Sequence, residues 1–191
     1  MQQWYVSYEY KLLKTMSFDN FWKNENLVSY FKLKYEDFSE PLDEYRVNHD
    51  GSLTRLRTPR YLWVKKNGKW GWIDSSENFV IPAIYDHGFV LCYDGVILLE
   101  RNGVYGGLYI DTLTTAFQFK YNRLSYLKNG TYMAYDHNDK IALVRPGDIM
   151  LTSYKYTGFI EDYAHRITYV RHGFFGESSG IIDPVSGREL S

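Results

Sequence analysis

One string constrains this chain more than any other feature, because it returns in altered form further along the sequence. It reads Asn-Gly-Lys-Trp-Gly-Trp-Ile-Asp at positions 67–74. Its copies begin at Asn67, Asn102, Asn138 and His172, so successive starts lie 35, 36 and 34 residues apart. A near-constant period of this length is the signature of a repeat architecture, in which each unit buries its apolar surface by stacking on its neighbours.

Each repeat reads as a short run of antiparallel strands. An extended apolar run such as Tyr61–Val64 precedes an Asn-Gly pair, which is a strong hairpin signal because a type I′ turn needs two positive φ angles. A strand with the aromatic-glycine element follows, and then a run at Phe79–Asp86 in which Pro82 indicates a strand end or an edge strand. The predicted fold class is mainly β: antiparallel meander repeats of about 35 residues with about three strands each, as a curved array or a partial barrel or propeller-like ring. Residues 61–191 are the predicted β-repeat domain, as one cooperative unit.

The first 60 residues lack the repeat, and we expect them to form a separate N-terminal strand and helix segment. Aromatic residues alternate over positions 4–10, which is a strand pattern. Phe18–Tyr30 follows a capping serine, carries an early acid and places its apolar residues near one helical face, so a short helix is predicted there. Residues 36–44 hold five acids and a proline, which predicts an exposed loop or sheet edge.

The first repeat resembles a known family. Lys69-Trp70-Gly71, with Asn67-Gly68 before it and the run 79–86 after it, is similar to a unit of the WG-repeat proteins. The second copy has Val-Tyr-Gly in place of Lys-Trp-Gly, and the later copies diverge further, so the resemblance covers roughly residues 61–183 and weakens along the chain. The resemblance implies a β-repeat scaffold without a conserved catalytic apparatus.

The charge and composition of the chain indicate which partners and which cellular compartment to expect. The net charge of −1 provides no overall field toward nucleic acid or anionic lipid, so neither is an expected partner. The single cysteine, Cys92, excludes an intramolecular disulfide framework and favours a reducing cytoplasm. The first residues resemble no signal peptide, and no apolar run is long enough to cross a membrane, so we expect a cytoplasmic protein without membrane contact.

Motifs that would indicate catalysis are missing from the sequence. The five histidines are scattered and the lone cysteine has no partner in sequence, so neither a metal site nor another cofactor is predicted. No nucleophile-elbow, Walker A or dinucleotide-binding string is present, and Gly103–Gly107 reads as a hairpin with a bulge. A basic stretch interleaved with Trp63, Trp70 and Trp72 could in principle contact single-stranded nucleic acid, but edge protection of strands explains it better. We therefore expect a protein that is not an enzyme.

The favoured hypothesis is a bacterial cytoplasmic binding protein that acts on another protein. A short, aromatic, disulfide-free chain with degenerate WG-like repeats is similar to immunity proteins of toxin–antitoxin pairs, which sterically block a cognate toxin, here a basic one such as a nuclease. The candidate contacts are the acids that would attract it electrostatically: Glu36, Asp37, Glu40, Asp43 and Glu44. The alternatives are a carbohydrate- or structure-binding repeat module with the rings of Trp63 and Trp72 as sugar platforms, and a hydrolase.

Overall fold

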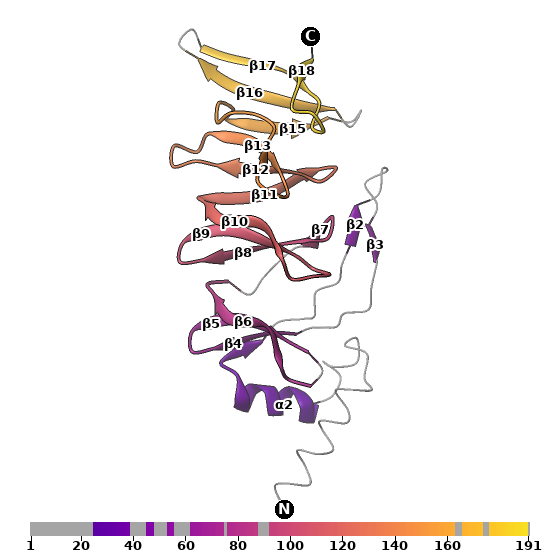
Figure 1. The fold of residues 1–191 in the computed structure, drawn as a ribbon, viewed down its shortest axis with the longest axis vertical. Helices are drawn as coiled ribbons and strands as arrows, with labels where there is room; N and C mark the ends of the chain where they lie inside the picture. Colours follow the sequence, from indigo (N-terminus) through magenta and orange to yellow (C-terminus); the bar gives the residue numbers. More distant parts are fainter. Residues whose placement is uncertain are drawn as a thin grey trace, which may run out of the picture. The chain divides into compact units, whose positions relative to one another are not determined.

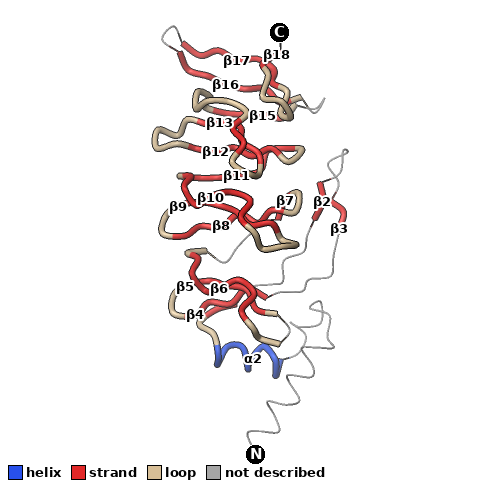
Figure 2. Tube along the Cα trace, in the orientation of Figure 1, coloured by secondary structure: helices blue, strands red, loops and turns tan. Residues whose placement is uncertain are grey.

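The structure, a computed structural model, describes residues 25–38, 45–47, 53–55, 62–74, 76–87, 92–162, 166–173 and 176–190. These residues form successive antiparallel sheets and one helix, α2 (Glu25–Lys34), coloured red and blue in Figure 2. The chain divides into two compact units, residues 1–102 and 103–191. The sequence predicts that residues 61–191 fold as one cooperative domain, separate from residues 1–60, and this division stays a prediction.

Four sheets of four strands follow one another along the chain (Figure 1). The first has the order β1-β4-β5-β6, with β1 Asp37–Phe38, β4 Leu62–Lys66, β5 Lys69–Ile73 and β6 Phe79–Tyr85. The second comprises β7 Cys92–Tyr93, β8 Val96–Arg101, β9 Val104–Tyr109 and β10 Thr115–Tyr121 in chain order. The third comprises β11 Arg123–Lys128, β12 Thr131–Tyr135, β13 Ile141–Arg145 and β14 Ile149–Met150, and the fourth β15 Gly158–Glu161, β16 Ile167–Gly173, β17 Gly176–Ile182 and β18 Glu189–Leu190. A separate hairpin pairs β2 (Tyr45–Val47) with β3 (Leu53–Arg55).

The mainly β prediction with antiparallel meander repeats is confirmed, and the structure refines three details. Each repeat has four strands rather than three, because a strand such as β1 or β11 precedes the extended run from which the repeat was counted. Among the described strands the sheets remain separate and do not close into a barrel. The helix spans Glu25–Lys34 instead of ending at Tyr30, and positions 18–24 of the predicted helix lie outside the described residues.

The repeated turn forms as its sequence predicts. Asn67 and Gly68 have φ angles of 54° and 75°, and Asn102 and Gly103 have 54° and 77°. Both central residues are therefore left-handed, as a type I′ hairpin requires. The turns join β4 to β5 and β8 to β9, so the repeat string marks the central hairpin of a sheet. Pro82 lies in β6, the last strand of its sheet, which confirms the predicted edge position.

Gly71 in the middle of β5 allows β6 to approach closely. A Cβ atom at this position would lie 2.6 Å from the carbonyl oxygen of Ile81, 2.7 Å from the nitrogen of Ala83 and 2.8 Å from the carbonyl carbon of Pro82. All three are backbone atoms of the neighbouring strand, so no side chain can rotate away. The glycine of the Trp-Gly-Trp element is thus a packing requirement of the first sheet.

Gly71→Ala should therefore lower the free energy of unfolding by about 2 kcal/mol or more, because the β5–β6 pair must separate to admit a methyl group. Gly158→Ala is the matched control. A Cβ atom at position 158 would have the Cβ of Val170 as its nearest neighbour, at an ordinary contact distance of 3.9 Å. Urea unfolding of both variants measures the difference. Equal stability of the two variants would contradict the packing argument.

In the second unit, the third and fourth sheets share one apolar cluster. Ile141 and Leu143 of β13 pack with Ile167 and Tyr169 of β16 and with Ile182 of β17, and all five are buried. Side chains alternate between the two faces of a strand, so these residues define the inner face of the fourth sheet. Among the described residues, the fourth sheet thus packs on the third through this face.

The last strand, β18, is held by a carboxylate. Glu189 accepts hydrogen bonds from Lys155 Nζ at 2.7 Å, from the Tyr156 hydroxyl at 2.8 Å and from the Tyr169 hydroxyl at 3.1 Å. Arg171 Nη1 lies 3.6 Å from the same carboxylate. These donors, Lys155 first among them, lower the pKa of Glu189 from 4.5 to about 2.

Glu189→Gln should destabilise the protein in a pH-dependent way. Since the folded-state pKa lies below the ordinary value of 4.5, the carboxylate stabilises the fold fully above that pH and loses its effect as the pH falls toward 2. We expect the free energy of unfolding to fall by on the order of 1 kcal/mol at neutral pH. The difference in stability between variant and wild type should disappear as the carboxylate of the wild type becomes protonated. Urea unfolding at a series of pH values measures it, with Tyr169→Phe as a milder variant that removes one donor. A gap that stays constant down to pH 2 would contradict the proposed linkage.

Candidate functional site

The helix α2 and the residues after it form an exposed polar segment of the first unit. Glu25 in the first turn and Lys32 and Lys34 in the last turn match the helix dipole. Leu27 and Phe31, one turn apart, are buried at 1% and 0% exposure and pack in one cluster with side chains of β4 and β5. The helix is thus fixed to the first sheet by its apolar face, and Figure 1 shows it beside β4.

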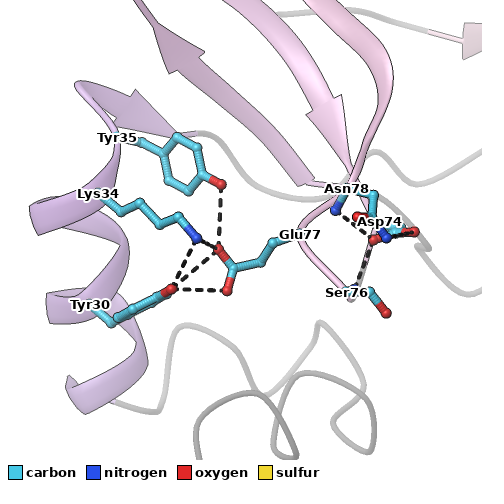
Figure 3. A network of polar contacts seen from close by, with 7 residues as sticks. All are labelled: Tyr30, Lys34, Tyr35, Asp74, Ser76, Glu77 and Asn78. Atoms are coloured by element: carbon cyan, nitrogen blue, oxygen red, sulfur yellow. Dashed lines mark hydrogen bonds and ion pairs between the residues drawn. The ribbon is translucent and has the colours of Figure 1, made fainter. Parts of the chain in front are cut away.

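A polar network fixes the other side of the helix. The Tyr30 hydroxyl donates to Glu77 Oε1 at 3.0 Å, and the Tyr35 hydroxyl donates to Glu77 Oε2 at 3.4 Å (Figure 3). Lys34 forms an ion pair with the same carboxylate and donates to the Tyr30 hydroxyl at 3.1 Å. Three side chains of residues 30–35 therefore converge on one carboxylate of the first sheet.

The loop between β5 and β6 aims Glu77 at the helix. Asp74 Oδ1 accepts hydrogen bonds from the backbone N–H groups of Ser76 at 2.8 Å and of Asn78 at 3.0 Å. This arrangement places Glu77 in the left-handed region, with φ of 59°. Figure 3 shows the consequence, since the Glu77 side chain points toward Tyr30 and Lys34 while the Asp74 contacts stay within the loop. A local turn therefore supplies the helix anchor.

The titration behaviour of this network suits a structural contact. Burial raises the pKa of Tyr35 to about 12, and it also raises the pKa of Tyr30. Burial alone would lower the pKa of Lys34, but its hydrogen bonds to Glu77 and Tyr30 outweigh this effect and raise that pKa. A general acid or base works best with a pKa near the working pH. At neutral pH these three groups instead remain protonated donors to Glu77.

The predicted acidic contacts are placed only in part. Glu36 is exposed, and its carboxylate accepts the backbone N–H of Gly68 at 3.0 and 3.2 Å. It therefore caps the Asn-Gly turn of the first repeat, a structural role that the sequence did not reveal. Asp37 is exposed at the start of β1, and its Oδ1 accepts the backbone N–H of Phe38 at 2.9 Å. The other predicted contacts, Glu40, Asp43 and Glu44, lie outside the described residues.

Sequence reasoning missed one apolar side chain at this site. Leu33 lies between two lysines and is 90% exposed, the largest exposed fraction among the large hydrophobic residues described. Its position could have been found, because Leu27, Phe31 and Tyr35 are spaced four apart and Leu33 falls off that face. The exposed residues on and after the end of the helix are Lys32, Leu33, Lys34, Glu36 and Asp37, and we call them the α2–β1 segment.

The prediction that Trp63 and Trp72 offer sugar platforms is wrong. Both rings are 1% exposed and pack edge to face with centroids 5.1 Å apart. They are directly opposite in β4 and β5, so each buries the other on one face of the sheet. Buried rings can stack neither on a sugar nor on a base. Gly103 lies in the turn before β9 and residues 104–107 lie within that strand, so no helix begins there that could hold a phosphate group.

Neither a cluster of metal ligands nor a membrane-spanning helix occurs in the described parts of the chain. There, no three His, Cys, Asp or Glu side chains come together as ion ligands. No helix among those residues has the length and apolar character to cross a bilayer.

Comparison with known proteins gives only distant likenesses. No protein-family model and no curated protein matches the chain. Among solved structures, the N-terminal domain of Nup159 is similar at a TM-score of 0.35 and 10% identity, over 79% of this chain and 44% of that one. A structure of S. cerevisiae Dbp5 with Nup159, Gle1, IP6 and ADP is similar at a TM-score of 0.36 and 11% identity, over 78% of this chain and 45% of that one. The extracellular domain of BT4673 from B. thetaiotaomicron is similar at a TM-score of 0.36 and 10% identity, over 71% of this chain and 21% of that one. The chain spans less than half the length of these structures, and likenesses this distant carry no argument about function.

Glu77→Gln should release α2 from the first sheet. The change removes the charge that pairs with Lys34 and leaves a weaker acceptor for Tyr30, so we expect a loss of about 1–3 kcal/mol in local stability. Hydrogen exchange of residues 25–34 measures it. Glu100→Gln is the control, because that carboxylate pairs at 3.1 Å with His87, whose side chain is 71% exposed. Unchanged protection of the helix in the Glu77 variant would show that its apolar face alone holds it.

Proposed function

We propose that this chain is a non-enzymatic cytoplasmic protein that binds another protein, and more narrowly an immunity protein that covers a cognate toxin. Its action would be steric: the bound scaffold blocks access of substrate to the toxin. The resemblance of residues 61–183 to WG-repeat units supports a scaffold role. The single cysteine, which is buried, supports a reducing compartment.

The observation that carries the proposal is the rigid exposure of the α2–β1 segment. Phe31 is buried and Lys34 is paired with Glu77, so the end of the helix is held from two sides. Leu33 nevertheless points an apolar side chain into solvent, and the carboxylates of Glu36 and Asp37 follow within four residues. Contacts that are already ordered lose little entropy on binding, which favours a docking role.

The segment combines an apolar anchor with steering charges. A large apolar side chain that becomes buried at the centre of an interface contributes much of its affinity. Carboxylates at the rim mainly accelerate encounter with a basic partner. Leu33 would take the first role, and Asp37 with Glu36 the second, joined by the acids at positions 40, 43 and 44. A nuclease toxin, which must itself be basic to bind nucleic acid, fits this pattern.

The polar clusters support a protein that performs no chemistry. Glu77 and Glu189, which each accept several donors, are each engaged by lysine and tyrosine side chains of the same unit. Groups held in this way attach a helix or a strand and leave no nucleophile beside a base. These contacts favour binding over catalysis.

The experiment begins with capture of the partner from the native host, followed by kinetics with the purified pair. Asp37→Asn combined with Glu36→Gln removes two charges, while the Gln amide oxygen still accepts the Gly68 N–H. We expect association to slow roughly three- to tenfold, with a weaker dependence on salt. Leu33→Ala should act mainly by faster dissociation.

Asp139→Asn is the matched control for the charge variant. Asp139 is exposed and left-handed at φ of 56°, a conformation that asparagine also adopts. It lies in the turn before β13, away from the α2–β1 segment in the chain. Association rates that fall equally in the control, or stay unchanged in the charge variant, would remove this segment as the docking site.

A further inference from the structure

The chain contains three Asn-Gly pairs, and each forms the two-residue turn of a hairpin. The pairs join β4 to β5, β8 to β9 and β11 to β12, at Asn67-Gly68, Asn102-Gly103 and Asn129-Gly130. In the third turn the φ angles are 50° and 70°, so both central residues are left-handed, as in the other two turns. All three asparagines are exposed. The three turns therefore match in sequence, backbone conformation and access to water.

An Asn-Gly pair carries the groups for a spontaneous modification, the deamidation of asparagine. The backbone nitrogen of the glycine attacks the side-chain carbonyl carbon of the asparagine. A new N–C bond closes a succinimide ring, and the side-chain nitrogen leaves as ammonia, which takes up the proton that the attacking nitrogen loses. Water then adds to either carbonyl group of the ring and opens it to aspartate or isoaspartate. Glycine has no side chain that hinders the attack.

In the first repeat, the attacking nitrogen is held by a carboxylate. The two carboxylate oxygens of Glu36 accept the backbone N–H of Gly68 at 3.0 and 3.2 Å. The backbone N–H of Glu36 donates to the carbonyl oxygen of Lys65 at 3.0 Å, and Asp37 then pairs with Lys65 in the first sheet. Pairing of the backbone thus brings the Glu36 side chain to a turn 32 residues further along the chain.

We propose that Asn67 is a deamidation site and that the carboxylate of Glu36 protects it. Loss of the Gly68 N–H proton would place a second negative charge 3.0 Å from the carboxylate, so Glu36 opposes the ionisation that starts the attack. The hydrogen bond to a charged acceptor must also break before the nitrogen can turn toward the Asn67 side chain. Both effects slow closure of the ring. The inference is independent of the proposed function, because it requires no partner protein.

The modification would act on the attachment of β1 to the turn. Isoaspartate carries one additional backbone carbon through a turn that has only two residues. Either product also places a carboxylate next to Glu36, and the two like charges repel each other. The contact between Glu36 and Gly68 is thereby weakened, and with it one of the contacts that hold the α2–β1 segment. Asn67 is therefore a position at which a slow chemical change can release this segment.

Peptide mass spectrometry after incubation of the full chain at mildly alkaline pH tests the proposal, because it measures deamidation at all three turns in one sample. Glu36→Ala removes both the charge and the hydrogen-bond acceptor. We expect this variant to deamidate at Asn67 roughly three- to tenfold faster than wild type. Glu36→Gln keeps an acceptor and loses the charge, so its increase should be smaller.

Two kinds of control accompany these variants. Asp37→Asn removes the neighbouring charge but leaves the Glu36 contact, since the Asp37 carboxylate accepts the N–H of Phe38 instead. This variant should deamidate at Asn67 at the rate of wild type. The other two Asn-Gly turns belong to the second and third sheets, so their rates should be the same in every variant.

Three outcomes would overturn the proposal. An unchanged rate at Asn67 in Glu36→Ala would show that the carboxylate does not protect the turn. A slower rate would show that it acts as a base and draws the proton from Gly68. An equal increase at all three turns would show that the variant exposes the chain by unfolding, and that the folded state as a whole, not Glu36, restrains the reaction.

Discussion

The sheets of this chain need a covering layer, because four short strands have two faces and no interior. The apolar residues of the first sheet are buried when Phe31 and Leu27 of α2 lie over them. Those of the third sheet are buried against the fourth. The Asn-Gly turns and the close approach at Gly71 then set where each strand lies, and the carboxylates of Glu77 and Glu189 fasten the elements at the margins. Stability therefore rests on contacts between layers more than on any single sheet.

Much of this fold could be predicted from the sequence, because its signals are local. A type I′ turn needs left-handed residues, and Asn67-Gly68 supplies them within two positions. The prediction of three strands missed elements such as β1 and β7, which have two residues each and are too short to show a period of two. The predicted helix ended too soon, at Tyr30 instead of Lys34, because the aromatic run 18–22 outweighed Leu27, Phe31 and Tyr35, whose spacing marks the face that is buried.

The candidate site was less predictable because its contacts join distant positions. Tyr30 and Glu77 are 47 residues apart, and no local pattern indicates that they meet. Glu36 was predicted to be an exposed contact for a partner, yet it caps a turn 32 residues further along. Trp63 and Trp72 illustrate the opposite difficulty, since an aromatic residue in a half-buried strand has the same sequence signal whether its ring faces water or another ring. The residue that lies opposite the ring on the neighbouring strand decides whether the ring is buried.

The order of strands in the first sheet has a consequence for how such proteins diversify. Phe38 of β1 pairs with Val64 of β4, although residues 39–61 come between them in the chain. The free energy needed to close a loop grows only with the logarithm of its length, by about 0.6 kcal/mol for each doubling. The insertion can thus change in length and sequence while the pairing that it interrupts stays the same. Changes in this segment are thereby uncoupled from the pairing of β1 with β4.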